Sequence, residues 1–177
     1  MSGFLADLAA VWIEPGLHKE IRVGTVNKIV DYFVHGSKDL LCIWRDNCVN
    51  DFVYIDPVGQ VVQCDCSVTR HPEFHFGNVL VEGSLMDLLL NGEACRRLQT
   101  KPGEVVRKED CPDCKYLALC HVGCPIRAYT VCGDVFRKDP YFELYRRLFQ
   151  HMEELTSGSL NGGPNANEFE GVKRIRT

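Results

Sequence analysis

The chain has 177 residues, of which 45% are hydrophobic and 25% charged, a composition that suits one globular domain or a small domain with appendages. Its 20 lysines and arginines and 24 aspartates and glutamates give a net charge of -4, which excludes a broad basic surface for nucleic acid. The sequence shows neither a run of roughly 18 apolar residues nor a signal-peptide pattern. We therefore expect a cytoplasmic protein without nucleic-acid or membrane partners.

The first 36 residues are predicted to be helical. Apolar residues recur at helical spacing from Phe4 to Val11, and again over residues 18–35. The turn signal Glu14-Pro15-Gly16 separates the two segments. This lead-in precedes every cysteine of the chain, the first of which is Cys42.

A β-hairpin is predicted next. Two short β-prone runs, 51–55 and 60–63, flank a turn that Pro57 and Gly59 favour. Cys48 lies before the hairpin and Cys64 at its far end. The two cysteines therefore bracket the predicted hairpin.

Helices and loops are predicted to alternate over the rest of the chain. Ser84, with Asp87 three residues later, predicts a short capped helix that is interrupted at Asn91-Gly92 and continues to Gln99. Residues 101–110 predict a loop, and the backbone of residues 111–132 is expected to be set by metal ligation rather than by regular structure. Asp139-Pro140 predicts the start of an amphipathic helix to about residue 156, followed by a flexible tail over 157–177. The fold class is therefore α+β.

The ten cysteines carry the functional signal. Such a count in a reducing compartment favours metal or redox chemistry over disulfides. Four of them, Cys111, Cys114, Cys120 and Cys124, are close enough in sequence for one loop to surround a small inorganic centre. Zinc and iron–sulfur clusters both use four thiolates, so this spacing alone does not distinguish them.

The wider spacing resembles a known family. Cys48 is followed by ten residues, Gly59, four residues and Cys64, and the later cysteines read Cys-x2-Cys-x5-Cys-x3-Cys with Cys132 after a gap. This pattern, from Cys42 to Cys132, resembles the SPASM domain, the auxiliary iron–sulfur region at the C-terminal end of many radical S-adenosylmethionine (SAM) enzymes. Three short segments support the resemblance: Gln63-Cys64-Asp65, Gly77-Asn78-Val79 and Gly123-Cys124-Pro125.

The resemblance implies two 4Fe–4S clusters, held among cysteine-rich loops and a small hairpin with flanking helices. By position, it assigns Cys42, Cys48, Cys64 and Cys124 to the first auxiliary cluster and Cys111, Cys114, Cys120 and Cys132 to the second. It also implies a SPASM domain over 37–156, with residues 1–36 as a lead-in that could end a radical SAM core. Of the two remaining cysteines, Cys66 is expected to be a spare thiol and Cys95 to pack as a small apolar residue.

Other candidate residues have competing interpretations. The resemblance to sulfatase-maturating enzymes makes Asp65 a candidate substrate base, whereas a structural role is to accept backbone hydrogen bonds beside the cluster. Because eight cysteines complete two sites, the histidines at 71, 75 and 121 are expected to be solvated or hydrogen-bonded rather than ligands. Arg127 and Tyr129 are expected to pack rather than to contact clusters or substrate.

The sequence lacks Cys-x3-Cys-x2-Cys, with which radical SAM enzymes hold their SAM-binding cluster. The chain as given is therefore not expected to generate a radical alone. The resemblance implies three partners: a radical SAM core, as part of a longer enzyme or as a separate subunit, a peptide or protein substrate, and an electron donor or acceptor protein. The implied function is electron transfer and substrate positioning in peptide modification. A stand-alone iron–sulfur subunit, a binding module with structural clusters and a structural zinc protein are the alternatives.

Overall fold

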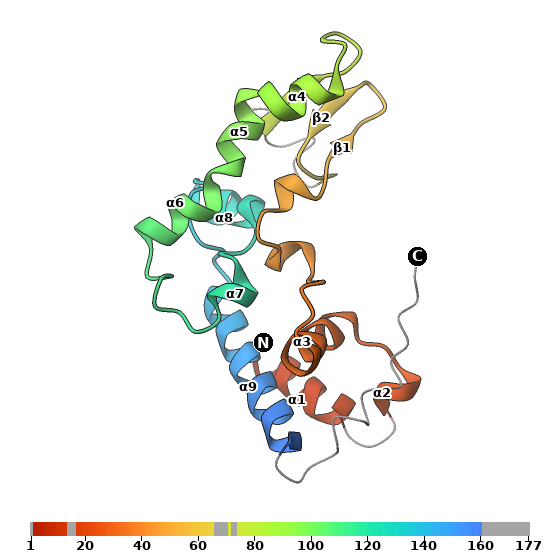
Figure 1. The fold of residues 1–177 in the computed structure, drawn as a ribbon, viewed down its shortest axis with the longest axis vertical. Helices are drawn as coiled ribbons and strands as arrows, with labels where there is room; N and C mark the ends of the chain where they lie inside the picture. The colour runs from red at the N-terminus through yellow and green to blue at the C-terminus, as the bar shows by residue number, and fades with distance from the viewer. Residues whose placement is uncertain (1, 14–16, 66–70, 72–73, 161–177) are drawn as a thin grey trace. The chain divides into compact units, whose positions relative to one another are not determined.

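The structure, a computed structural model, describes residues 2–13, 17–65, 71 and 74–160. The chain divides into two compact units (Figure 1): residues 1–41 with 141–177, here called the helical unit, and Cys42–Pro140, here called the cysteine unit. All ten cysteines belong to the second. The predicted domains, 1–36, 37–156 and 157–177, stay predictions. None of the helices in the described ranges is long and apolar enough to cross a membrane.

The helical unit contains α1 (Ser2–Ile13), α2 (Leu17–Glu20), α3 (Gly24–His35) and α9 (Phe142–Leu160). The early helix is confirmed, but the single helix predicted over 18–35 is divided into α2 and α3. The division has a local cause, because the indole Nε1 of Trp12 donates a 2.6 Å hydrogen bond to the carbonyl of Ile21. That carbonyl would otherwise accept the next bond of a continuous helix.

Apolar side chains hold the helical unit together. Helix α9 packs against α1 and α3. Its buried hydrophobic residues are Ala9, Trp12, Ile13, Val26, Ile29, Val30, Leu40, Tyr145, Leu148, Phe149 and Met152. Helix α9 begins two residues after the predicted Pro140 and reaches Leu160, so the first residues of the predicted tail are helical; 161–177 lie outside the described residues.

The cysteine unit contains a three-stranded antiparallel sheet in the order β1 (Tyr54–Ile55), β2 (Gln60–Val62) and β3 (His75–Asn78). The predicted hairpin is confirmed, with Ile55 opposite Val61. Its turn is closed by the Asp56 carboxylate, which accepts hydrogen bonds from the backbone N–H groups of Val58 and Gln60, both at 2.9 Å. Strand β3 was not predicted; it pairs with β2 through a register shift between Val61 and Val62.

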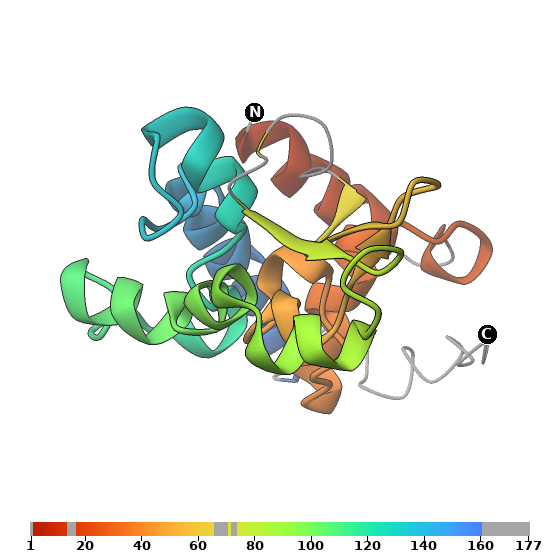
Figure 2. The ribbon, with the colours of Figure 1, turned by 90° about the horizontal axis from the view of Figure 1, so that it is seen from above.

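Two helices follow β3, in the region where the sequence predicts a capped helix that is interrupted at Asn91-Gly92. They are α4 (Leu85–Asn91), whose N-cap Ser84 Oγ accepts from the backbone N–H of Asp87 at 3.2 Å, and α5 (Glu93–Gln99). Both contact β3, the yellow-green strand of Figure 2. The apolar core between them consists of Val49, Val61, Phe74, Phe76, Leu88, Cys95, Leu98, Val135 and Phe136.

The predicted loop over 101–110 is wrong, because residues Lys101–Lys108 form helix α6. Pro102 occupies the first turn, where its missing N–H has no helical partner to lose. Thr100 Oγ1 donates to the Glu104 carboxylate at 3.0 Å, and Val105 is completely buried. The helix therefore has both a stabilised start and a packed face.

Regular structure also extends into the cysteine-rich segment, contrary to the prediction. It contains α7 (Leu117–Cys120) and α8 (Pro125–Cys132), and Gly133 ends α8 in the left-handed conformation. Single 3-10 turns, η1 (Cys42–Trp44) and η2 (Cys48–Asn50), lie before the hairpin. Together with the sheet, these helices confirm the α+β class.

Candidate metal centre

The predicted ligand cysteines lie at the ends of short elements. Cys42 and Cys48 each begin a 3-10 turn, Cys64 follows β2, Cys111 and Cys114 precede α7, Cys120 ends α7, Cys124 precedes α8 and Cys132 ends α8. None of the described cysteines forms a disulfide. Burial raises the pKa of Cys124, whereas backbone hydrogen bonds from Arg127 and Ile126 at the start of α8 lower it.

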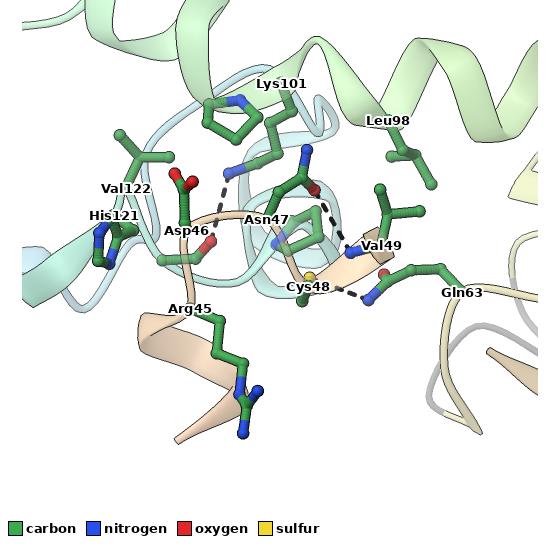
Figure 3. Close-up of a pocket in the computed structure, with 13 residues that line it drawn as sticks. Arg45, Asp46, Asn47, Cys48, Val49, Gln63, Leu98, Lys101, His121 and Val122 are labelled. Carbon is green, nitrogen blue, oxygen red and sulfur yellow. Dashed lines mark hydrogen bonds between the residues drawn. The ribbon is translucent and has the colours of Figure 1, made fainter. Parts of the chain in front are cut away.

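Cys48 is the best-enclosed thiol of the first predicted set. Its Sγ accepts a 3.0 Å hydrogen bond from Gln63 Nε2, as Figure 3 shows. The pKa of Cys48 is raised to about 12, chiefly by burial and also by nearby Cys124, Cys64 and Cys42, whereas Lys101 lowers it. The structure therefore places the three other members of this set within electrostatic range of Cys48.

Cys120 is the thiol of the second predicted set whose pKa is most strongly raised. Burial raises its pKa to about 12, and Asp139, Cys114 and Cys111 act in the same direction. Burial also raises the pKa of Cys111, to which Cys114 contributes. Cys132, at the exposed end of α8, completes the set by sequence alone. The assignment of eight cysteines to two clusters stays a prediction.

The backbone between Cys120 and Cys124 is unusual. His121, Val122 and Gly123 all adopt positive φ, at 47°, 62° and 75°. This conformation is costly for His and for β-branched Val, so the surrounding contacts must enforce it. His121 Nδ1 lies 2.7 Å from the carbonyl oxygen of Trp44, and the backbone N–H of Asp139 donates to the Val122 carbonyl at 2.9 Å.

Two buried charged residues hold the peptide bond that joins Gly123 to Cys124. Lys101 Nζ donates to the Gly123 carbonyl at 3.3 Å, and the Cys124 backbone N–H donates to Asp139 Oδ2 at 3.0 Å. Burial lowers the pKa of Lys101, against the opposing effect of Cys48, Cys124, Asp139 and Cys120. Sequence analysis missed both residues. Lys101 was assigned to a loop, and Asp139 was interpreted only as a helix start.

A small pocket lies beside Cys48 and Lys101 (Figure 3). Gln63, Leu98 and His121 contribute to its walls. Its free volume is about 10 Å³, near the lower limit for one water molecule. The pocket is therefore too small to admit a peptide side chain as it stands.

The remaining candidates have varied surroundings. Asp65 is exposed and directly follows Cys64, and Cys66 lies outside the described residues. Cys95 is 1% exposed within the apolar core, which confirms that it packs as a small apolar residue.

Aromatic and polar contacts account for several others. The ring of Tyr129 lies edge-on to His71 and Phe74, at centroid distances of 4.7 and 4.9 Å. Arg127 Nη1 lies 3.8 Å from Asp139 Oδ2. His75 lies on β3, half-buried. Tyr129 is thus part of the packing, as predicted.

The donor set fits thiolate-ligated iron. In the described part of the chain, no three His, Cys, Asp or Glu side chains converge closely enough to hold a single metal ion. In a 4Fe–4S cluster each thiolate binds a different iron, so the four sulfurs surround a larger volume. The free thiols around Cys48, and the amide N–H that Gln63 offers to a sulfur, match the ligands and hydrogen bonds of such a cluster.

Comparison with known proteins gives a consistent result. Residues 42–115 match the SPASM family, an iron–sulfur cluster-binding domain. An uncharacterized protein of Archaeoglobus fulgidus is 30% identical over 79 residues, which are 41% of this chain and 19% of the relative. Five predicted ligands, from Cys42 to Cys114, lie inside the family match.

Two solved structures share the fold. Histidine-tagged anSMEcpe with bound AdoMet has a TM-score of 0.67 and 18% identity over 99% of this chain and 45% of its own. Native anSMEcpe with bound AdoMet has a TM-score of 0.66 and 19% sequence identity, and the match covers 91% of this chain and 42% of that one. The chain thus spans less than half the length of either solved structure and about a fifth of the archaeal relative. We conclude that residues 42–115 carry the match to the SPASM family, an iron–sulfur cluster-binding domain, and that the chain shares the fold of the two solved structures.

Proposed function

We propose that the chain binds two 4Fe–4S clusters and serves a radical SAM enzyme that modifies a peptide or protein. The radical SAM core would belong to the same longer enzyme or to a partner subunit. When bound, such clusters accept and release single electrons at potentials set by their ligands, burial and hydrogen bonds. The residues of this chain would supply the thiolates, exclude water and fix the sulfur positions.

One observation carries the proposal: Cys42, Cys64 and Cys124 all contribute to the raised pKa of Cys48, although up to 82 residues separate these cysteines in sequence. Cys124 comes from the same short loop as Cys120, whose electrostatic neighbours are Cys114 and Cys111. One loop would therefore serve both clusters, and would fix their separation. A fixed and short separation is what single-electron exchange between them requires.

Anaerobic reconstitution with iron and sulfide tests the two-cluster assignment. The wild-type chain should bind about eight iron and eight sulfide, whereas two zinc and no sulfide would support the structural zinc protein. Replacing Cys48 with Ala should remove about four iron, and replacing Cys120 with Ala should remove the other four. Cys95→Ala is the matched control, because Cys95 is buried among apolar side chains and should leave iron content unchanged.

Separate spectra keep this test decisive. Each cysteine variant should retain the reduced-state electron paramagnetic resonance signal of one cluster, and the two signals should differ. Complete iron loss from both variants, with circular dichroism showing a folded chain, would contradict two separable sites. The protein without a core should also leave AdoMet intact, because its sequence lacks Cys-x3-Cys-x2-Cys.

Substrate positioning is the second candidate function. Strand β1 lies at the edge of the sheet, and the side chains of Phe52, Val53, Tyr54 and Ile55 are exposed there. An exposed edge strand can pair with an extended peptide. If positioning is the main role, the clusters will resist reduction under conditions that support peptide modification. A reductive titration of the reconstituted protein therefore distinguishes the two functions.

A further inference from the structure

Lys101 is an unusual side chain in this unit. Lys101 is only 3% exposed. Within the described residues, its ammonium group donates one hydrogen bond, to the Gly123 carbonyl at 3.3 Å. No described carboxylate lies within 4.0 Å of its ammonium group. Burying a charge without a counter-charge is strongly unfavourable. Burial lowers the pKa of Lys101, and Asp139 acts in the opposite direction from beyond ion-pair distance. Asp139 also faces Arg127 at 3.8 Å, so an anionic group close to Lys101 would compensate its charge more fully.

The surroundings of Lys101 indicate where that anionic partner would be. Lys101 and Cys48 line the same pocket, and Figure 3 shows the lysine extending from α6 to the loop that precedes Cys124. Both cysteines belong to the first predicted cluster. A cluster held by four thiolates is anionic, so its binding would bring negative charge to the side of the pocket that Lys101 faces.

We propose that Lys101 is the buried counter-ion of the first auxiliary cluster, a positioning residue that favours the reduced form of that cluster. The inference rests on the proposed function, because it requires a cluster at Cys48 and Cys124. Lys101 would act through space and through the Gly123–Cys124 peptide, without binding iron.

The peptide geometry supports a specific placement of this charge. Lys101 holds the carbonyl end of the Gly123–Cys124 peptide, while Asp139, 0% exposed, holds its N–H end at 3.0 Å. Two opposite charges therefore fix one peptide plane next to a predicted ligand. Lys108, on the same helix, differs from Lys101 in burial and in pairing: its side chain is 61% exposed and forms an ion pair with Glu104 at 3.0 Å.

The sign of the effect follows from electrostatics. Reduction of a cluster takes up one electron, supplied by dithionite in the assay, and so adds one negative charge without breaking a bond. A nearby positive charge stabilises the reduced form more than the oxidised form. Removing that charge should lower the reduced-to-oxidised ratio at a fixed potential. We expect a change of about tenfold, which corresponds to about 59 mV for one electron.

Redox titration of the reconstituted chain, monitored by electron paramagnetic resonance, tests the proposal. Lys101→Met removes the charge and the hydrogen bond, Lys101→Gln keeps a donor without the charge, and Lys101→Arg keeps the charge. Both neutral variants should lower the reduced fraction of the cluster that Cys48→Ala removes, and Lys101→Arg should stay within about twofold of wild type. Lys108→Met is the matched control and should change nothing.

The outcomes separate charge from structure. Full iron content with unchanged potentials in both neutral variants would overturn the proposal, and so would a shift in Lys101→Met alone, which would indicate only the hydrogen bond. If the neutral variants lose iron and Lys101→Arg keeps it, charge is required for cluster binding and the proposal is supported. Iron loss from all three would refute it in favour of side-chain shape. A wild-type chain that binds no iron or sulfide would instead contradict the proposed function.

Discussion

The helical unit and the cysteine unit are stabilised in different ways. The helical unit buries Trp12, Ile29, Phe149 and Met152 between long helices, and it contains no cysteine. The cysteine unit has an apolar core too, but this core lies between the sheet and α4–α5. Its segment from Cys111 to Cys124 contains instead half-buried thiols and three consecutive residues with positive φ. The comparison indicates that dependence on metal is local.

Iron removal should give the largest effect and test this comparison directly. With the clusters absent, the buried thiols are neutral and the strained loop loses its cross-links, so residues 111–132 should lose structure. Hydrogen exchange measured before and after anaerobic chelation should show protection lost there and retained in α3 and α9. Equal loss of protection in α3 and α9 would show that the helical unit depends on metal as well.

Truncation of the helical core is the converse test. Phe149 is 0% exposed, and Phe149→Ala should lower the free energy of unfolding by about 3–5 kcal/mol through lost burial and a cavity. Urea denaturation of the reconstituted protein measures this change. At low urea the variant should still bind the wild-type amount of iron. A proportional fall in iron content would contradict independent stabilisation of the two units.

Glycine replacements compare backbone strain in the two units. Gly123 and Gly36 both have positive φ, at 75° and 63°. A Cβ on Gly123 would lie 2.3 Å from Asp139 Cβ, whereas a Cβ on Gly36 would meet nothing within 4 Å. Gly36→Ala should therefore cost only the conformational strain of about 1–2 kcal/mol.

Gly123→Ala should cost more than Gly36→Ala, and should also reduce the iron content, because Asp139 or the Cys124 peptide must move. Thermal unfolding and iron analysis of the two variants, side by side, measure both effects. Equal losses of stability with equal iron content would show that the Asp139 contact does not fix the position of Cys124.

The sequence was most informative where local patterns decide the structure. Ser84 with Asp87 located the start of α4, and Pro57 with Gly59 located the hairpin turn. The cysteine spacing indicated the family because the number of residues between ligands can be read directly from the sequence, without knowledge of the fold. The strand β3 and the division of α2 from α3 were missed, since each depends on a contact with residues outside the element itself, β2 for one and Trp12 for the other.

The contacts of Lys101 and Asp139 could not be predicted from the sequence, because they too depend on partners distant in sequence. Lys101 is significant only because α6 forms and directs its ammonium group to the Gly123 carbonyl. Asp139 is significant because it accepts the Cys124 N–H. The residues that neighbour Lys101 and Asp139 in sequence do not predict either contact. From the sequence, a lysine next to Pro102 is expected in a solvent-exposed loop, whereas in the fold it begins α6 and is buried.

The smallest expected effect concerns the part of the cysteine unit that does not need metal. Ser84 Oγ accepts the Asp87 backbone N–H at 3.2 Å and so satisfies one unpaired donor of α4. Ser84→Ala should lower the free energy of unfolding by about 1 kcal/mol. Because α4 packs on the apolar core, the loss should be the same with and without iron. Urea denaturation of both forms measures it, with Ser84→Asp as a control that restores an N-cap acceptor. A clearly larger loss in the iron-free form would mean that the clusters also stabilise the sheet and its helices, and the metal-dependent region would then extend beyond 111–132.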